Sequence, residues 1–321
     1  MPDIANMGKT QPVQQTDSIQ YDVSEKAENI AQEQSAAEIE KETYSASNST
    51  NAAGIPTPMI YDKTAPIVVF IGPPASGKSM ILVRLAKYLR DHGFSIDTDP
   101  TFLNTEQYRK DCEKFKGCLN TTIALDGTVE FLLVNVYDRE NKLVAKLLEA
   151  PGEDFYTPDS SKSNKNNMLQ GYLSTIMTSE NPKSYVMLLD LDSKVSFRND
   201  PRLTSEYTQR FMNYFYKNIH PSRDRIILLY NKIDMTRLGS INGCTDEKAA
   251  REDAMKYYTQ LFNSMKVTKF VFWELDNFAF KTFCTGQFTD ATDDNGNPYQ
   301  TYNIADNVYP RELWKEIIRR W

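Results

Sequence analysis

The segment Gly72 to Ser79, with the sequence GPPASGKS, places a lysine and a hydroxyl directly after a glycine-containing turn. It matches the GxxxxGK[ST] spacing, in which the glycines let the backbone curve so that successive N–H groups point at a phosphate. Lys78 would reach the β- and γ-phosphate oxygens of a nucleoside triphosphate, and the Ser79 hydroxyl would bind Mg²⁺. The helix that follows would add its positive N-terminal end. The predicted phosphate-binding residues are Gly72, Pro73, Pro74, Ala75, Ser76, Gly77, Lys78, Ser79 and Met80.

A second motif, Asn231 to Asp234 (NKID), follows the apolar run RIILLY. The carboxyl end of a strand is where ligands bind in open α/β sheets. There, Asp234 can accept hydrogen bonds from both the N1–H and the exocyclic amine of guanine, whereas adenine offers no matching pair of donors. The stem of Lys232 can cover the face of the base, and Asn231 can tie the motif to the phosphate loop. The motif therefore predicts a guanine nucleotide.

With these two motifs the chain resembles the Ras-like (TRAFAC-class) P-loop GTPases over most of residues 67–321. The sequence EAPGE, from Glu149 to Glu153, stands where that family has DxxG, and the resemblance implies that the Gly152 N–H senses the γ-phosphate. Glu149 replaces an aspartate that holds Mg²⁺ through water, and it is one methylene longer. Glu153 stands where many members carry a water-orienting glutamine, and a carboxylate there would repel the γ-phosphate. We therefore expect Lys78, Gly152 and Glu153 to be the catalytic residues and intrinsic hydrolysis to be slow.

The same resemblance implies further elements. A third base-recognition turn would correspond to Cys284 and Thr285. The effector-loop threonine that binds Mg²⁺ would precede the second strand, where Thr122 and Thr128 both qualify. The C-terminal sequence YNIADNVYPRELWKEIIRR, residues 302–320, resembles the ending of bacterial double-GTPase-type proteins. The candidate Mg²⁺ ligands are Ser79, Glu149 and Thr122.

Strand-like and helix-like segments alternate from Ile67 onward, which is the pattern of a parallel α/β sheet. The expected fold class is α/β, a P-loop NTPase three-layer fold with a mostly parallel central sheet. Apolar runs predict strands at 67–71, 184–192 and 225–234 and a hairpin at 131–150. Helices are expected after the phosphate loop as far as Gly93, and at 202–219, 245–265 and 312–321. Two further strands are expected at 269–275 and 281–286.

The first 60 residues differ in composition from the rest of the chain. They carry nine acidic and three basic side chains with few large apolar ones, and such a segment cannot bury enough surface to offset the entropy of ordering it. We therefore expect a disordered acidic tail at 1–60 and one GTPase-like domain at 61–321. The remaining 34 acidic and 34 basic side chains cancel, so charge favours no nucleic-acid partner.

Cysteine and hydropathy patterns bear on the cellular setting. The four cysteines are scattered and only two histidines are present, which does not fit a Cys/His zinc site. The chain starts without the apolar core of a signal peptide, and no apolar run approaches the ~18 residues of a membrane span. We expect a cytoplasmic protein without an intrinsic membrane segment.

Together these features predict Mg²⁺-dependent binding of GTP and GDP, with slow, partner-stimulated hydrolysis, by a molecular switch that acts on a protein effector or responds to a protein activator. Two alternatives stay open. One is a GTP-binding module with negligible hydrolysis, which the carboxylates of Glu149 and Glu153 favour. The other is an ATP-dependent P-loop kinase, in which Asp190 at the end of an apolar run would hold Mg²⁺, although no arginine cluster can be assigned to a lid.

Two polar stretches have no assigned chemistry. The loop YTPDSSKSNKNNM, residues 156–168, follows the proposed γ-phosphate sensor and is equally consistent with a switch that orders on GTP binding and with a surface insertion. The stretch TDATDDNGNP, residues 289–298, lacks the ligand spacing of a calcium loop and is interpreted as an ordinary surface turn.

Overall fold

The structure is a computed structural model that describes residues 60, 62–99, 102–103, 105–125, 131–156, 171–190, 197–220, 222–269 and 273–319. These residues belong to one compact unit, Pro56–Trp321. The predicted acidic tail lies outside the described residues up to position 59, as do Thr128 and residues 157–168 of the polar loop. The domain boundary at residue 60 therefore stays a prediction.

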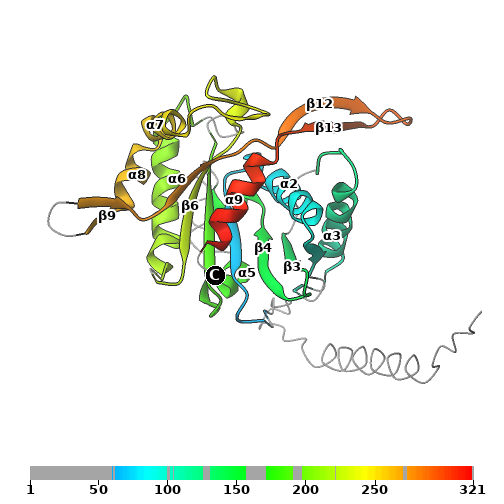
Figure 1. Cartoon of the computed structure of the whole chain (residues 1–321), viewed down its shortest axis with the longest axis horizontal. Coiled ribbons are helices and arrows are strands. Elements are labelled where there is room, and N and C mark those ends of the chain that lie inside the picture. The colour runs from blue at the N-terminus through cyan, green and yellow to red at the C-terminus, as the bar shows by residue number, and fades with distance from the viewer. Residues whose placement is uncertain are drawn as a thin grey trace, which may run out of the picture. The chain divides into compact units, whose positions relative to one another are not determined.

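The described chain forms a seven-stranded sheet in the order β11-β6-β5-β1-β4-β3-β2 (Figure 1). The strands β11, β6, β5, β1 and β4 run parallel to their neighbours, and β3 and β2 extend the sheet in antiparallel pairing. The predicted α/β class with a mostly parallel central sheet is confirmed. The strands are β1 (Ile67–Ile71), β2 (Ser95–Thr98), β3 (Leu132–Tyr137), β4 (Leu143–Glu149), β5 (Lys183–Leu189), β6 (Arg225–Tyr230) and β11 (Ala279–Thr282).

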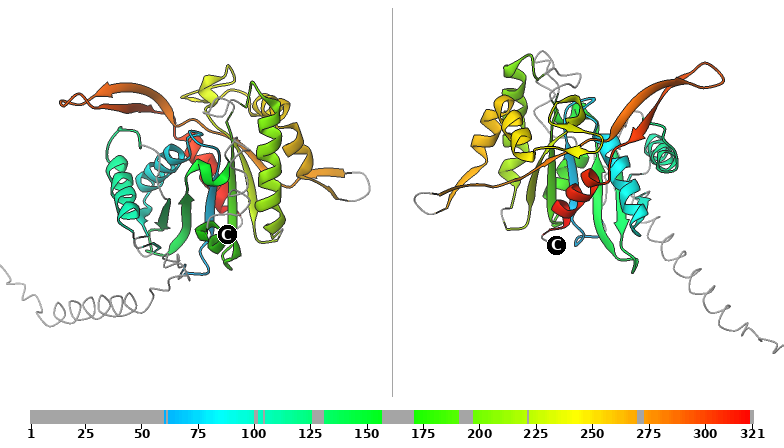
Figure 2. Two further views of the ribbon diagram at one scale, coloured as in Figure 1. Left: turned by 180° about the vertical axis from the view of Figure 1, so that it is seen from behind. Right: turned by 45° about the horizontal axis from the view of Figure 1, so that its top comes forward.

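Helices cover both faces of the sheet, as the buried apolar runs of its central strands require. Helix α9 crosses the near face in Figure 1 beside α2, and α6 crosses the opposite face, seen from behind in Figure 2. Strand β1 is buried along its whole length, which places the core on both sides of it. The helices are α2 (Lys78–Asp91), α3 (Glu106–Leu119), α4 (Gly152–Phe155), α5 (Gly171–Thr178), α6 (Pro201–Tyr214), α7 (Glu247–Tyr257), α8 (Thr259–Ser264) and α9 (Val308–Ile318), with 3₁₀ turns η2 (Tyr216–Asn218) and η3 (Ile233–Met235).

The parallel strands end at one edge of the sheet, and this edge collects the predicted motifs. The phosphate loop follows β1, the EAPGE sequence begins at the last residue of β4, and NKID follows β6. The turn with Cys284 follows β11. Loops 50 to more than 200 residues apart in sequence therefore meet at the carboxyl edge, where open α/β sheets bind ligands.

Small two-stranded units complete the described structure: β7 (Gly239–Ser240) with β8 (Gly243–Cys244), β9 (Lys266–Lys269) with β10 (Trp273–Asp276), and β12 (Gly286–Thr292) with β13 (Pro298–Ile304). The β12–β13 hairpin projects from the body of the domain (Figure 1). Of the surface turn predicted at 289–298, residues 293–297 form the tip, whereas 289–292 belong to β12 and Pro298 to β13. At the tip, Asp293 Oδ1 accepts from the backbone N–H groups of Asn295 and Asn297.

Several predicted elements differ from the structure in extent. The helix predicted at 202–219 is α6 followed by a 3₁₀ turn, and the helix predicted at 245–265 is interrupted at Tyr258. Tyr258 is buried and its hydroxyl donates to the Asp190 carbonyl at 3.2 Å, which fixes the chain at the break. The single strand predicted at 269–275 is instead parts of β9 and β10. Helix α3 and the β12–β13 hairpin were not predicted.

Among the described residues, no helix combines the length and the apolar character needed to cross a lipid bilayer.

Candidate functional site

The phosphate loop is curled by two residues in left-handed conformation. Ala75 has φ 59° and Gly77 has φ 89°. Alternation of right- and left-handed residues turns successive N–H groups toward one side and forms an anion-binding concavity. Gly77 also lacks room for a side chain, because a Cβ there would lie 2.8 Å from Asn231 Nδ2. The loop therefore has the backbone shape that its sequence predicts.

Helix α2 begins at this loop with an N-terminus suited to an anion. The first N–H groups of a helix have no intrahelical acceptor. The N-cap residue of α2 is Gly77, and within the described residues no side chain forms a capping hydrogen bond there. The first turn of α2 contains no acidic residue that would compensate the positive end of the helix. Both features fit a bound phosphate group.

Lys78 is buried at the centre of the loop. Its Nζ donates to the carbonyl oxygens of Gly72 at 3.1 Å and Pro73 at 3.2 Å, and it lies 5.9 Å from the centre of the Phe155 ring. Burial lowers the pKa of Lys78 below its usual value of 10.5. The carboxylates of Glu149 and of neighbouring acidic residues oppose this shift by favouring the charged form. The ammonium group is thus held in place before any phosphate arrives.

Ser79, in the first turn of α2, contacts Glu149, the last residue of β4. The Ser79 hydroxyl donates to Glu149 Oε1 at 3.0 Å, and Glu149 is buried. A hydroxyl and a carboxylate are oxygen ligands of the kind that Mg²⁺ prefers. The longer side chain of glutamate therefore does not keep the carboxylate away from Ser79. No group of three or more His, Cys, Asp or Glu residues is assembled around a common point in the described parts of the chain.

Gly152 packs directly against the phosphate loop. A Cβ at this position would lie 2.2 Å from Pro74 N and 2.4 Å from Pro73 C, so only glycine fits here without a shift of the backbone. Glu153, the next residue, is exposed and lies near enough to Lys78 to favour its charged form. The structure thus brings the predicted sensor and the phosphate loop together.

The NKID motif contacts the phosphate loop through two side chains. Asn231 Nδ2 donates to the Ser76 carbonyl at 2.8 Å, which is the tie that the sequence suggests. Lys232 adopts a left-handed conformation with φ 55°, and its Nζ donates to the Ala75 carbonyl at 3.3 Å. The same ammonium group forms a 2.8 Å ion pair with Asp190 at the end of β5. Lys232 therefore connects three loops of the carboxyl edge.

Asp234 and Cys284 are brought together although 50 positions separate them. The Cys284 thiol hydrogen-bonds Asp234, and burial together with this carboxylate raises the pKa of the thiol. The backbone adds a second contact, because Ile233 N donates to Phe283 O at 3.2 Å. Thr285 is buried beside them. The two predicted base-recognition segments therefore form one surface.

The structure does not bring Thr122 to the other Mg²⁺ candidates. From Asn120, whose side chain contacts Arg90, the chain runs back along α2, and the Thr121 carbonyl meets Lys87. It reaches the first turn of α2 only at Leu125, whose N–H donates to Met80 Sδ at 3.1 Å. Thr122 consequently lies beside the middle of α2, away from Ser79. Its backbone carbonyl accepts from Tyr302 N at 2.9 Å. Thr128, the other candidate, lies outside the described residues.

Two contributors to the site were not predicted in the role that the structure gives them. Asp190 entered the sequence analysis as a Mg²⁺ ligand of a kinase, but its carboxylate pairs with Lys232. Phe155 was not singled out, and its buried ring faces Lys78. The contact between Asp190 and Lys232 could have been predicted from the pairing of β5 with β6. The contact of Phe155 with Lys78 depends on tertiary packing, which the sequence pattern does not show.

Comparison with known proteins gave structural likenesses alone. No family model and no curated protein sequence matches the chain. Solved structures that are similar to it include the following three. A nucleolar GTP-binding protein 1 from Plasmodium falciparum has 13% identity and a TM-score of 0.35, covering 71% of this chain and 80% of its own. Era from Aquifex aeolicus, bound to GDP and AlF₄⁻, has 14% identity and a TM-score of 0.34, covering 70% and 52%.

The third is the signal recognition particle receptor SRb-GTP/SRX complex from Chaetomium thermophilum. It has 13% identity and a TM-score of 0.38, covering 81% of this chain and 100% of its own. At these values the likenesses carry no argument about function.

Proposed function

We propose that this chain binds GTP and GDP with Mg²⁺ and acts as a slowly hydrolysing molecular switch. The observation that supports this best is the contact between the NKID motif and the phosphate loop, in which Asn231 Nδ2 donates to Ser76 O at 2.8 Å. A phosphate loop alone serves any nucleoside triphosphate. A strand-end carboxylate, Asp234, fixed beside that loop adds selection for guanine.

Different residues would bind the phosphates, the Mg²⁺ ion and the base of the nucleotide. The N–H groups of the curled loop and of the first turn of α2 would hold the phosphates, and Lys78 would place a positive charge on the β- and γ-oxygens. Ser79 and Glu149 would hold Mg²⁺, which neutralises charge on the phosphate oxygens when bound. Asp234 would accept from the guanine base, with the stem of Lys232 over its face.

Hydrolysis would be slow because of Glu153. The family that the chain resembles often orients the attacking water with a glutamine at this position, and a carboxylate repels the γ-phosphate instead. The same observation favours the second candidate, a GTP-binding module with negligible hydrolysis. Multiple-turnover phosphate release, measured with and without cell extract, separates the two.

The kinase alternative is less well supported. It requires a strand-end carboxylate for Mg²⁺, and Asp190 is instead engaged with Lys232 at 2.8 Å. This ion pair stabilises the guanine-recognition motif, so the contact favours the GTP-binding proposal.

We extend the proposal to the cellular setting. All four cysteines are free, three of them buried, which fits a reducing compartment such as the cytoplasm. A switch requires a protein effector or activator, and we propose that residues 61–321 form the single domain that such a partner meets.

The deciding experiment is a competition titration with GTP, ATP and XTP on the wild type, Asp234→Asn and, as a control, Asp294→Asn at the exposed hairpin tip. The wild type should prefer GTP over ATP by ~10²–10⁴, because adenine offers the Asp234 carboxylate no matching pair of donors. Asp234→Asn replaces one acceptor with a donor, which suits the carbonyl that xanthine has in place of the guanine amine. It should lose GTP affinity and gain relative affinity for XTP. Equal binding of ATP and GTP by the wild type would reject the proposal in favour of the kinase.

A further inference from the structure

The β12–β13 hairpin begins and ends at the proposed base-recognition turn. Strand β12 starts at Gly286, directly after Thr285, and Ala305 N, just past β13, donates back to Thr285 O at 3.2 Å. The junction is tight: Gly286 has φ 151°, and a Cβ there would lie 2.1 Å from Asn303 O. Any movement of the hairpin base therefore acts on the turn that carries Cys284 and Thr285.

The other edge of the hairpin is paired with the segment after α3. Tyr302 N donates to Thr122 O at 2.9 Å, and Ala124 N donates to Gln300 O at 2.7 Å. Between these bonds Ile123 forms an antiparallel bridge with Thr301. Residues 122–124 thus pair with β13 through a single antiparallel bridge. This segment leads toward the stretch before β3, where the effector loop of the resembled family lies.

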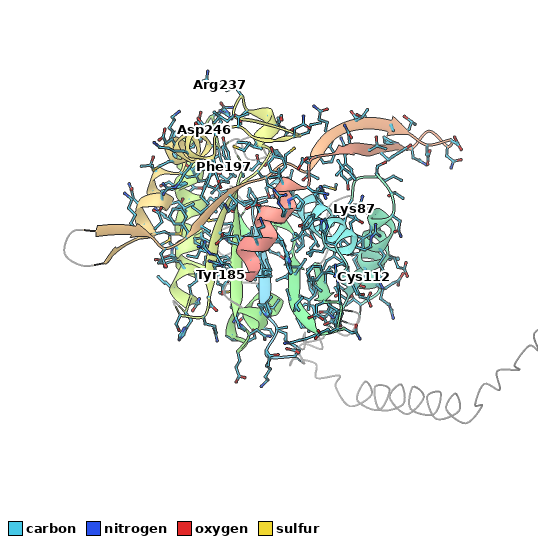
Figure 3. All side chains as sticks on the ribbon, viewed as in Figure 1. Lys87, Cys112, Tyr185, Phe197, Arg237 and Asp246 are labelled. Atoms are coloured by element: carbon cyan, nitrogen blue, oxygen red, sulfur yellow. The ribbon has the colours of Figure 1, made fainter. Side chains whose placement is uncertain are left out.

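Helix α2 anchors the junction through Lys87. Its Nζ donates to the Thr121 carbonyl and to the Tyr302 hydroxyl, the latter at 2.7 Å, and lies 4.9 Å from the centre of the Tyr302 ring. Lys87 is only 5% exposed. Figure 3 labels it on α2, below the hairpin in that view. One buried ammonium group therefore holds both the segment and the hairpin.

A second residue of α2 fixes the hairpin base. Arg84 Nη2 donates to Ala305 O at 2.9 Å and to Asn307 Oδ1 at 2.6 Å. At the other end of the segment, Leu125 N contacts Met80 in the first turn of the same helix. The base-recognition turn, the hairpin and residues 121–125 are thereby attached to the helix that follows the phosphate loop.

We infer that Lys87 is a positioning residue that, through the β12–β13 hairpin, couples the base-recognition turn to residues 121–125, the entry to the effector loop. The inference rests on the proposed function. Residues 121–125 cannot move without breaking their bonds to β13 or carrying the hairpin with them. The resemblance implies that GDP would engage the phosphate loop and the base turn, whereas the γ-phosphate of GTP would also require the effector loop. Loss of Lys87 should therefore weaken GTP binding selectively.

The first test compares Lys87→Met and Tyr302→Phe with Lys114→Met, which alters an exposed lysine of α3. Affinities for GDP and for the slowly hydrolysed analogue guanosine 5′-O-(3-thiotriphosphate) are measured by titration with Mg²⁺. Lys87→Met should lower the triphosphate affinity roughly fivefold to tenfold relative to that for GDP. Tyr302→Phe should give a smaller change in the same direction, and Lys114→Met no change. Equal loss for both nucleotides, or no loss, would overturn the inference.

The second test uses amide hydrogen exchange of the nucleotide-free full chain, followed by mass spectrometry. The backbone N–H groups of Ala124 and Tyr302 both donate hydrogen bonds between residues 121–125 and β13. Lys87→Met should therefore accelerate exchange in residues 121–125 and 300–305 together. Acceleration in only one of the two segments contradicts the coupling. If the wild type binds no guanine nucleotide, the proposed function fails, and this exchange measurement still decides whether the junction couples the two segments.

Discussion

At the scale of single residues, the site is defined by the way in which Lys78 is held. Its ammonium group lies between the Gly72 and Pro73 carbonyls and beside the Phe155 ring, in a buried position. Such an arrangement leaves little side-chain entropy to lose when a ligand binds. Nearby acidic residues oppose the lowering of its pKa by burial. The residue is therefore oriented for an anion before one binds.

Lys78→Ala should weaken triphosphate binding at least tenfold. A charge-assisted hydrogen bond contributes ~1.5–3 kcal/mol, and ~1.4 kcal/mol is a factor of ten in affinity. A titration with a fluorescent guanine nucleotide measures the effect, with Lys114→Ala on the exposed side of α3 as the control. Unchanged affinity of Lys78→Ala would remove the basis for a phosphate loop.

Glu153→Gln should raise the intrinsic rate of GTP hydrolysis. The change removes a negative charge near the proposed γ-phosphate position and supplies the residue that many members of the resembled family carry. Single-turnover phosphate release reports the rate, and a parallel titration verifies that GTP still binds. An equal or lower rate with GTP binding intact would contradict the proposal that the Glu153 carboxylate slows hydrolysis.

The sequence was sufficient to predict which of the candidate site residues lie close together, where their placement follows from backbone spacing. The phosphate loop, Asn231 and Gly152 lie together as their motifs suggest, because each motif directly follows a strand or ends it. Thr122 could not be resolved in this way. Its position depends on the path of the chain along α2, which is set by the contacts of Lys87 and Tyr302 rather than by a local pattern.

At the scale of elements, the short helix α4 joins the proposed γ-phosphate sensor to the core. It starts at Gly152 against the phosphate loop and ends at Phe155, whose buried ring lies 5.9 Å from that of Phe215. One end of α4 thus touches the phosphate loop, and the other end packs against Phe215, the residue that caps the C-terminus of α6. Gly152 is the residue of α4 at which an added side chain would clash most directly with the phosphate loop.

A pair of glycine substitutions tests this fit. Gly152→Ala places a methyl group within 3 Å of the Pro73–Pro74 backbone and should cost about 1–3 kcal/mol of folding free energy and weaken nucleotide binding. Gly117→Ala is the matched control, since a Cβ at this position of α3 meets nothing within 4 Å, and it should stabilise by about 0.5–1 kcal/mol. Urea unfolding measures both. Similar effects of the two changes would show that Gly152 is not tightly packed.

The two elements missed by sequence analysis differ in how predictable they were. Helix α3 had a readable pattern: Tyr108, Cys112, Phe115 and Leu119 lie on one buried face, and Thr105 caps the helix by accepting from Tyr108 N. The β12–β13 hairpin had none, because its strands are rich in polar residues and largely exposed. It is held by pairing with residues 121–125, a long-range contact that propensity does not encode.

At the scale of the whole molecule, the candidate site and a buried, purely structural lysine lie at opposite ends of the parallel strands. The motifs proposed to bind a nucleotide gather at the carboxyl ends of the parallel strands, and alternation of strands and helices was enough to predict that edge. The strand order was not predictable, since it depends on which buried faces pack together. At the opposite edge, the first residue of β5, Lys183, is fully buried, and its Nζ donates to the carbonyls of Ser179 at 2.7 Å and Asn181 at 2.8 Å.

Lys183 should make stability rise with pH between about 8 and 10.5. Burial lowers the pKa of Lys183 to about 8, from 10.5, with Asp224 opposing the shift. Between these two values the unfolded chain keeps a proton that the folded chain has released, so the folding free energy becomes more favourable as pH rises. Relative to Lys183→Met, the wild type should gain ~2–3 kcal/mol between pH 7.5 and 10.5, and the comparison cancels the titration of other groups. Urea unfolding across this range measures the difference, with Lys142→Met on the exposed turn after β3 as the control. A difference between wild type and Lys183→Met that stays constant with pH would contradict the prediction.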